Sequence, residues 1–190
     1  PNGNYYRISV KREAGSNNPD GMISNRLHDH VVEGDPIELS APAGTFVLNN
    51  STAARKIFIS GGVGQTPLLA MLENLILNQE QTEVPITWIH GCRNEDVHAF
   101  RNKVSELSST YANMDQHIFY EQLTAQQNTA YQGWVDLELL KENVLETEAE
   151  YYICGPAPFI TKHYHFLMEN GVQKTSIYFE EFGPASLQLN

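Results

Sequence analysis

The chain has 190 residues, of which 41% are hydrophobic and 18% are charged, so we expect a packed core and no extended disorder. Its 12 basic and 23 acidic side chains give a formal net charge of −11, which would repel nucleic acid and an anionic membrane surface. No stretch reaches the roughly 20 apolar residues that span a bilayer, and two cysteines are too few for a disulfide framework, so we expect a cytoplasmic protein.

The first fifty or so residues are predicted to form extended segments joined by turns. Alternating side chains over residues 6–10 predict one strand, and the stretch PIELSAP at 36–42 predicts another. Between them, Ser24 is expected to cap one short helix. Two or three strands can neither close a barrel nor bury both faces of a sheet. We therefore expect either a second chain or additional upstream sequence to cover them.

From residue 54 onward, buried strands alternate with amphipathic helices. The five strands are predicted at 56–60, 86–91, 116–121, 150–154 and 176–181. Apolar helical stripes begin at Leu68 and Phe100, and Asp136 is a candidate helix cap. A last helix is predicted from Pro158 to Gly171. Parallel strands need crossover connections, so this order predicts an α/β fold with a five-stranded, parallel, doubly wound sheet.

The stretch ISGGVGQTP at 59–67 follows the first of these strands. In the dinucleotide fingerprint G-x-G-x-x-G, Pro67 takes the place of the third glycine, after Gly62 and Gly64. Proline is tolerated at the first helical position and Thr66 is a good N-cap, so we expect the glycine turn and the helix start to survive. Such a loop offers backbone N–H groups to a phosphate, and the missing Walker lysine argues against a nucleoside triphosphatase. The alternative is an ordinary glycine-rich turn.

Three further motifs follow strands of the predicted sheet. They are HGCRN at 90–94, CGPAP at 154–158 and EEFGP at 180–184. The carboxyl ends of parallel strands meet at one edge of a sheet, and open α/β sheets bind their ligands there. The sequence therefore predicts a ligand site at this edge.

Taken together, GGVGQTP, HGCRN followed by VHAF, YICGP and EEFGP resemble the reductase half of the flavohaemoglobins, within the ferredoxin-reductase-like family. The front of the chain agrees, because YRISVKRE, GMISNRLH and GDPIELSAPAG resemble the later part of that family's flavin barrel. The resemblance implies two domains, a partial antiparallel FAD-binding barrel at 1–52 and an NAD(P)-binding domain at 53–190. The family's Arg-x-Tyr-Ser flavin motif and its globin domain are absent, so the chain resembles a truncated reductase.

The resemblance also implies roles for individual residues. It places Phe182 against the flavin ring and Cys154 beside the nicotinamide. Glu180 belongs to the same terminal motif as Phe182, in which the acid preceding the phenylalanine tunes the redox potential. The residues implied to bind cofactors are Gly61, Gly62, Val63, Gly64, Gln65, Thr66, Arg93, Gly155 and Pro156 for NAD(P)H, and Gly21, Met22, Ile23, Ser24, Glu181, Gly183 and Pro184 for FAD. Taken singly, Phe182 has an ordinary alternative as a core residue, Cys154 as a buried inert thiol and Arg93 as a solvated charge.

No metal site is expected. The pairs His28-x-His30 and His163-x-His165 fall in predicted helices, where side chains two residues apart diverge. For the nicotinamide cofactor, the acidic pair at 95–96 beside Arg93 disfavours a 2′-phosphate, so NADH is preferred to NADPH.

The resemblance implies that NAD(P)H passes hydride to FAD and that electrons continue to a haem globin domain, serving nitric oxide dioxygenation in the intact parent. Haem would belong only to the missing globin domain. One alternative is a nucleotide-binding fragment without catalysis, because its barrel is incomplete. Another is a reductase whose electron acceptor is an iron–sulfur partner or free flavin.

Overall fold

The computed structural model describes residues 5–15, 19–49, 55–77, 84–123, 129–146, 148–181, 187 and 189. The chain divides into two compact units, which we call the N-terminal unit, Asn2–Thr45, and the sheet unit, Phe46–Asn190. Each unit is described by itself. In the described part of the chain, no helix is long and apolar enough to cross a membrane.

The N-terminal unit contains one helix, α1 (Met22–His30), and its described residues form no β-strand. The strands predicted at 6–10 and 36–42 are therefore wrong for this structure, because neither segment finds a partner strand for its backbone hydrogen bonds. The predicted N-cap of this helix, Ser24, is also wrong. Gly21 is the N-cap, and the Ser24 hydroxyl donates to the Gly21 carbonyl oxygen at 3.1 Å instead of capping the helix.

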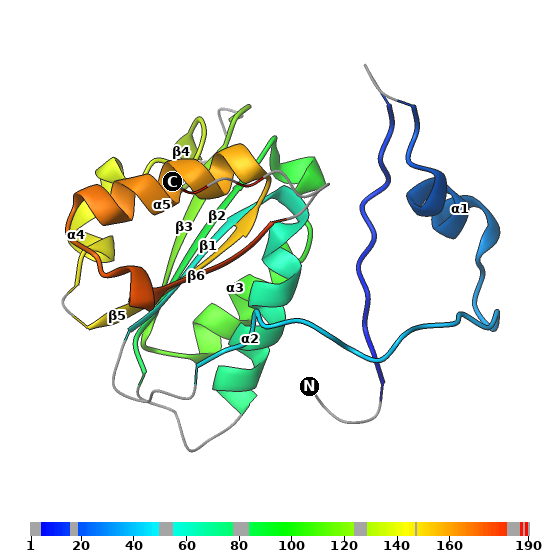
Figure 1. Cartoon of the computed structure of the whole chain (residues 1–190), viewed down its shortest axis with the longest axis horizontal. Coiled ribbons are helices and arrows are strands. Elements are labelled where there is room, and N and C mark those ends of the chain that lie inside the picture. The colour runs from blue at the N-terminus through cyan, green and yellow to red at the C-terminus, as the bar shows by residue number, and fades with distance from the viewer. Residues whose placement is uncertain are drawn as a thin grey trace. The chain divides into compact units, whose positions relative to one another are not determined.

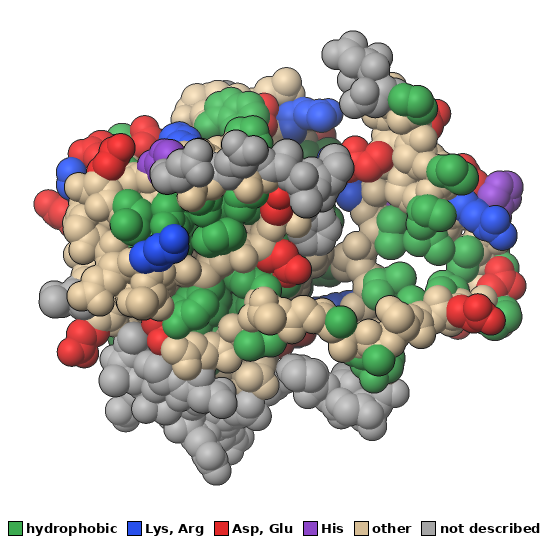
Figure 2. All heavy atoms as spheres, in the orientation of Figure 1, with side chains coloured by type: hydrophobic (Ala, Val, Ile, Leu, Met, Phe, Trp, Pro, Cys, Tyr) green, Lys and Arg blue, Asp and Glu red, His purple; other side chains and the backbone are tan. Residues whose placement is uncertain are grey.

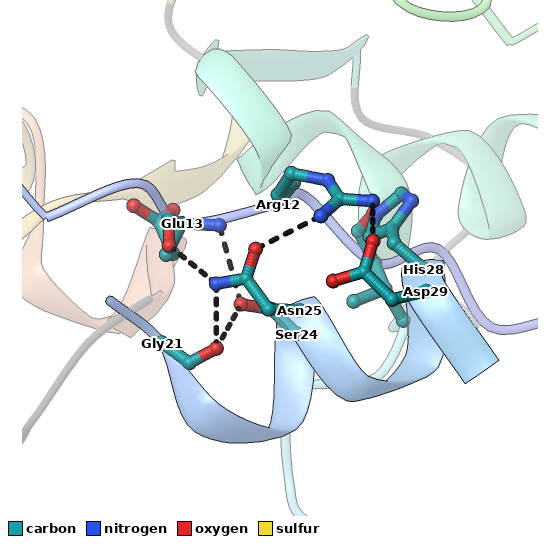
Figure 3. A network of polar contacts seen from close by, with 8 residues as sticks. Arg12, Glu13, Gly21, Ser24, Asn25, His28 and Asp29 are labelled. Atoms are coloured by element: carbon teal, nitrogen blue, oxygen red, sulfur yellow. Dashed lines mark hydrogen bonds and ion pairs between the residues drawn. The ribbon is translucent and has the colours of Figure 1, made fainter.

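Polar contacts hold α1 against the segment that precedes it (Figure 3). The Asn25 side-chain amide donates to the backbone oxygens of Glu13 at 2.9 Å and Gly21 at 2.8 Å. Arg12 donates to the Asn25 side-chain oxygen at 3.0 Å and pairs with Asp29 at 2.8 Å. None of the described α1 residues is buried, so these polar contacts rather than a core position the helix.

The sheet unit is built on six strands in the order β4-β3-β2-β1-β5-β6, and every neighbouring pair is parallel. Their bounds are β1 (Arg55–Gly61), β2 (Ile86–Cys92), β3 (Met114–Tyr120), β4 (Tyr131–Gln132), β5 (Ala149–Gly155) and β6 (Ile177–Glu181). All five predicted strands are confirmed. The sixth, β4, has two residues, which is too short for an alternating pattern to reveal it.

Helices cover both faces of this sheet, as the prediction of a doubly wound fold requires (Figure 1). Side chains alternate along β1, so Phe58 enters one core and its neighbours Ile57 and Ile59 enter the other. The Phe58 core includes residues of α2 (Gln65–Leu77) and α3 (Arg101–Thr110), and the opposite core includes residues of α4 (Lys141–Val144) and α5 (Ala157–Glu169).

Short 3-10 turns occur where the chain leaves or approaches the sheet. They are η1 (Gly62–Gly64), η3 (Glu95–Val97), η4 (Glu138–Leu140) and η5 (Lys174–Ser176). Asp136 accepts a hydrogen bond from the Glu138 N–H at 3.1 Å, but it is not the predicted helix cap, because Leu137 is the N-cap of η4 and Leu140 that of α4. Gly171, at a φ of +85°, follows α5 and ends it as the sequence indicated.

Candidate functional site at the carboxyl edge of the sheet

The strand order reverses between β1 and β5, which are neighbours in the sheet. The chain leaves β1 into α2 on one face and leaves β5 into α5 on the other face. The two connections therefore diverge at the carboxyl edge, which is the arrangement that forms a ligand crevice in open α/β sheets. This reversal is where open α/β sheets bind nucleotides. Four of the predicted motifs end at this edge, since Gly61 lies in register with Gly91 and Cys154 lies in register with Glu180.

The glycine loop crosses the end of β5 so closely that its backbone at Gly64 touches the backbone of β5. A Cβ added to Gly64 would lie 2.2 Å from the carbonyl oxygen of Cys154, a distance that no side chain tolerates. A Cβ on Gly155 would lie 2.9 Å from the Phe159 ring, and one on Gly61 would lie 3.1 Å from the same ring. The position of Gly64 therefore requires glycine for close backbone approach, which is a role of glycines in a phosphate-binding loop, whereas Gly61 and Gly155 pack against the side chain of Phe159.

Gly62 differs from these neighbours. Its φ of +55° lies in the left-handed region, and a Cβ built there would meet no atom within 4 Å. The backbone of the loop is thus open to the outside at Gly62 and closed against β5 at Gly64. A side chain therefore has room at Gly62 and none at Gly64.

The start of α2 differs from the prediction by two residues. The 3-10 turn η1 continues directly into α2 at Gln65, so Thr66 is not the N-cap and Pro67 is the third helical residue. Pro67 is still accommodated, because the first-turn N–H groups of a helix have no helical acceptor. Gln65 is buried, and its side-chain oxygen has no hydrogen-bond partner among the described residues.

Cys154 is fully buried at the end of β5, and its side chain belongs to the core that includes α2. Burial, together with the nearby Glu180 carboxylate, raises the pKa of the thiol to about 12. The group is a neutral, small apolar side chain at physiological pH rather than a thiolate nucleophile. Its placement beside a nicotinamide ring stays a prediction.

The remaining predicted residues lie at separate positions. Glu180 is exposed near the end of β6, Glu181 is half-buried beside it, and Pro156 is the N-cap of α5. Arg93 is exposed just after β2, and its carbonyl oxygen accepts the Gln122 N–H at 2.8 Å. Three residues of the terminal motif lie outside the described residues: Phe182, Gly183 and Pro184.

The predicted flavin-binding stretch at 21–24 belongs to the N-terminal unit, at the start of α1. Met22 and Ile23 are 81% and 67% exposed. Figure 2 shows hydrophobic side chains across the surface of this unit. The exposed set also includes Tyr5, Tyr6, Ile8, Val32, Ile37 and Leu39.

The family of the chain follows from comparison with known proteins. The model of the oxidoreductase NAD-binding domain matches residues 58–164, which contain the glycine loop, β2, β3 and β5. The chain belongs to this NAD-binding domain family. The match includes both sides of the crevice, since it runs from within β1 to within α5.

Similar proteins carry the resemblance further and confirm the predicted similarity to the C-terminal half of the flavohaemoglobins. A "Flavohemoprotein" of Bacillus thuringiensis subsp. konkukian is 40% identical over 190 residues, covering 98% of this chain and 47% of its own. One of Rhizobium meliloti is 38% identical over 188 residues, covering 97% of this chain and 46% of its own. The chain thus spans about half the length of the curated relatives it matches.

Solved structures agree with this placement. The flavohem-like FAD/NAD-binding domain of a Vibrio cholerae nitric oxide dioxygenase is 34% identical with a TM-score of 0.81, covering 92% of this chain and 70% of that one. The cytochrome b5 reductase domain of Ulva prolifera nitrate reductase has a TM-score of 0.77 at 20% identity, covering 90% of this chain and 70% of that one. The second likeness shows the fold alone.

Sequence reasoning missed a buried polar chain in the NAD-binding domain. It consists of Ser60, His90, His98 and Tyr120, which come from four separate parts of the sequence. Burial lowers the pKa of His90 to about 3, and the neighbouring His98 adds to the effect. Burial also lowers the pKa of His98 to about 4. The available signal was the pair of histidines in HGCRN and VHAF, but their contact depends on how the loop folds back.

A second missed feature is Trp134, which is 71% exposed in the segment after β4. Its neighbour Val135 packs over the end of β2, since a Cβ on Gly91 would lie 2.6 Å from a Val135 methyl group. Trp134 is therefore next to a residue that packs at the carboxyl end of β2. No group of three or more His, Cys, Asp or Glu side chains that could hold a metal ion occurs within the described ranges.

Proposed function

We propose that the chain is the NAD(P)H–FAD reductase portion of a flavohaemoglobin. In the intact protein its electrons would pass to a haem globin domain and serve nitric oxide dioxygenation. When bound, NAD(P)H supplies a hydride to FAD, which can release the electron pair one electron at a time. The observation that carries the proposal is the crossing of Gly64 and Cys154 at the strand reversal, in a chain that is 40% identical to a flavohemoprotein.

The glycine loop would hold the pyrophosphate of the nicotinamide cofactor. Gly64 brings the loop against β5, and Gly62 leaves its outer side open. The loop leads directly into α2, whose first-turn N–H groups and helix dipole favour an anion. Gln65 and Thr66 lie in that first turn, and Gly61 and Val63 complete the predicted cradle. The residues present therefore fit a diphosphate.

The nicotinamide end would lie toward β5 and β6. Gly155 ends β5 beneath the Phe159 ring, and Pro156 turns the backbone from this strand end into α5. Glu180 is exposed beside this strand end, where its carboxylate can influence the charge on a neighbouring redox group. The neutral thiol of Cys154 would contribute size and shape rather than a reacting proton.

The adenosine end would lie toward β2 and the loop at 93–100. Arg93 is exposed at the start of this loop, and Trp134 offers an indole face suited to stacking on adenine. Asp96 is exposed, so its carboxylate faces solvent, while Glu95 pairs with Arg101. An exposed carboxylate would repel a 2′-phosphate, which supports a preference for NADH over NADPH.

The resemblance assigns FAD contacts to the stretch at 21–24 and, separately, to the terminal motif at 180–184. The backbone N–H groups at the start of α1, in the stretch 21–24, would face the FAD pyrophosphate. Phe182 would lie against the flavin ring, with Glu181, Gly183 and Pro184 around it. Hydrophobic side chains remain exposed on the N-terminal unit, which supports an additional covering surface in the intact protein.

The decisive test uses Gly62, because a side chain fits there. Asn and Asp both tolerate the left-handed backbone, so Gly62→Asn and Gly62→Asp form a matched pair that differs in charge. We expect Gly62→Asn to bind NADH nearly as the wild type does, and Gly62→Asp to bind at least about tenfold more weakly. The measurement is an NADH titration by fluorescence. Equal affinities for the pair would overturn the loop assignment.

A second candidate function is nucleotide binding without catalysis. It is favoured by the N-terminal unit, whose described residues supply no strand of a flavin barrel. One experiment distinguishes the two functions. The chain is mixed with FAD, the excess FAD is removed, and NADH is then added under anaerobic conditions. Retained flavin that bleaches supports the reductase. Bound NADH without retained flavin supports the nucleotide-binding module.

A further inference from the structure

Four buried side chains form a polar chain beneath the carboxyl edge of the sheet. Ser60 on β1 shares a hydrogen bond of 2.8 Å with the Nδ1 atom of His90 on β2. The His90 ring packs on the His98 ring, with centroids 4.6 Å apart and planes 32° apart. His98 Nδ1 then shares a hydrogen bond of 2.7 Å with the hydroxyl of Tyr120 at the end of β3. All four residues are at most 8% exposed.

His98 is the member of this chain that does not lie on a strand. It belongs to the loop at 93–100, between β2 and α3, where Arg93, Asp96, Val97 and Ala99 are exposed. The side chain of His98 is therefore buried, whereas the side chains of its neighbours Val97 and Ala99 face solvent. A buried imidazole costs free energy unless its polar atoms are paired, and Tyr120 supplies the partner for one of them.

The loop needs such an attachment because its backbone is not regular. Phe100, its last residue, has a φ of +59°, a left-handed conformation that costs an aromatic residue free energy. The turn η3 adds three local hydrogen bonds: from the Val97 N–H to the Asn94 side chain at 3.3 Å, from the His98 N–H to the Glu95 carbonyl oxygen at 3.1 Å, and from the Ala99 N–H to the Val97 carbonyl oxygen at 3.0 Å. Tertiary contacts must hold a strained loop of this kind. The Gln122 N–H donates to the Arg93 carbonyl oxygen at one end of the loop, and His98 makes a side-chain hydrogen bond to Tyr120 on the sheet.

We propose that His98 and Tyr120 are positioning residues that hold the 93–100 loop in the shape that receives the adenosine of a dinucleotide. Neither residue is assigned to contact the ligand. They act through the exposed residues of the loop, whose backbone they fix on the sheet. The inference rests on the proposed function, because that function places the adenosine at this loop.

A specific pattern of binding follows. A ligand that carries adenosine should lose affinity when the hydrogen bond is removed, whereas a nicotinamide mononucleotide should not. A single neutral hydrogen bond changes an equilibrium constant by about three- to tenfold. Tyr120→Phe should therefore lower the affinity for ADP-ribose by about that factor. The affinity for NADH should fall by a similar factor, and the affinity for the reduced mononucleotide NMNH should be unchanged.

The chain offers a matched control for this change. Tyr131 on β4 shares a hydrogen bond of 3.3 Å with His117 on β3, so it forms a second Tyr–His pair. The Tyr131 ring stacks on Phe119, whose side chain lies in the core that includes residues of α4 and α5. Tyr131→Phe removes the same hydroxyl group without touching the 93–100 loop. It should change neither ADP-ribose nor NMNH binding.

The experiment is a set of titrations of the full chain with ADP-ribose, NADH and NMNH, for the wild type, Tyr120→Phe, His98→Phe, their double variant and Tyr131→Phe. Circular dichroism and thermal unfolding report whether each variant is folded. If His98 acts through Tyr120, the double variant should bind ADP-ribose no more weakly than His98→Phe alone. His98→Phe keeps a ring against His90, so it provides the second test if Tyr120→Phe folds poorly.

Unchanged ADP-ribose binding in folded Tyr120→Phe and His98→Phe would overturn the inference while leaving the proposed function in place. Equal losses for ADP-ribose and NMNH would overturn it as well, since they would indicate a general structural role. A wild-type chain that binds neither NADH nor ADP-ribose would overturn the proposed function, and the inference with it.

Discussion

The backbone of Gly64 packs against the carbonyl group of Cys154 so closely that a Cβ on Gly64 would lie 2.2 Å from the carbonyl oxygen. The contact joins the glycine loop after β1 to the last residues of β5, across the point where the strand order reverses. Any side chain at Gly64 would displace backbone rather than a flexible side chain. The substitution that tests charge therefore belongs at Gly62 and not at Gly64.

We expect Gly64→Ala to destabilise the sheet unit by about 3 kcal/mol, because the added methyl group overpacks two backbone segments. Gly62→Asn should cost less than about 1 kcal/mol, since Asn tolerates the left-handed conformation and has room. Urea unfolding of both variants measures the difference. A Gly64→Ala variant as stable as the wild type would contradict the close crossing.

A buried ion pair joins the first residues of β1 and β5. Lys56 is fully buried and pairs with Glu150, which also accepts hydrogen bonds from the Tyr152 hydroxyl at 3.0 Å and the Asn49 side chain at 2.9 Å. Lys56→Met leaves a buried carboxylate without its cation and should cost about 3 kcal/mol. Lys56→Met/Glu150→Gln should be more stable than Lys56→Met alone, because the amide is neutral. Urea unfolding measures both, and additive losses would argue against the pairing.

Three buried histidines should make stability depend on pH. Burial lowers the pKa of His90 to about 3, of His98 to about 4 and of His163 to about 3, from an ordinary value of 6.5. The unfolded chain therefore binds more protons than the folded chain between these values and 6.5. Stability should fall as pH drops below about 6.5, by about 1.4 kcal/mol per pH unit for each histidine.

His163→Leu isolates one of these contributions. Neither ring nitrogen of His163 has a partner among the described residues, so the substitution leaves no partner unpaired. Near pH 5 the slope of unfolding free energy against pH should decrease by about 1.4 kcal/mol per pH unit. His165→Gln, at an exposed position of the same helix, is the control and should keep the wild-type slope. Identical slopes for His163→Leu and the wild type would disprove the linkage.

The cofactor preference can be tested at Asp96, the exposed carboxylate of the 93–100 loop. Asp96→Asn should raise affinity for NADPH while leaving NADH affinity unchanged, because only NADPH carries the 2′-phosphate that the carboxylate would repel. A change of about threefold in the ratio is expected for a surface charge. Parallel titrations with the two cofactors at low salt measure it, and a constant ratio would count against this role of Asp96.

Much of the sheet unit could be predicted from the sequence, because local patterns decided it. Apolar runs and helical stripes located the five long strands and the helices between them, and the glycine loop and the motifs at strand ends placed a site at the carboxyl edge. These features depend on residue type and spacing over a few positions. Parallel pairing then brings the strand ends together whatever the details of packing.

Only the tertiary structure decided the features that depend on partners distant in sequence. Strands were predicted near the N-terminus, but extended segments become strands only when another strand binds them, and the described N-terminal unit supplies none. The two-residue β4 exists because β3 lies beside it, and α2 begins early because η1 continues into it. Likewise His98 meets Tyr120 because the loop folds back onto the sheet, a contact across 22 positions that no local pattern encodes.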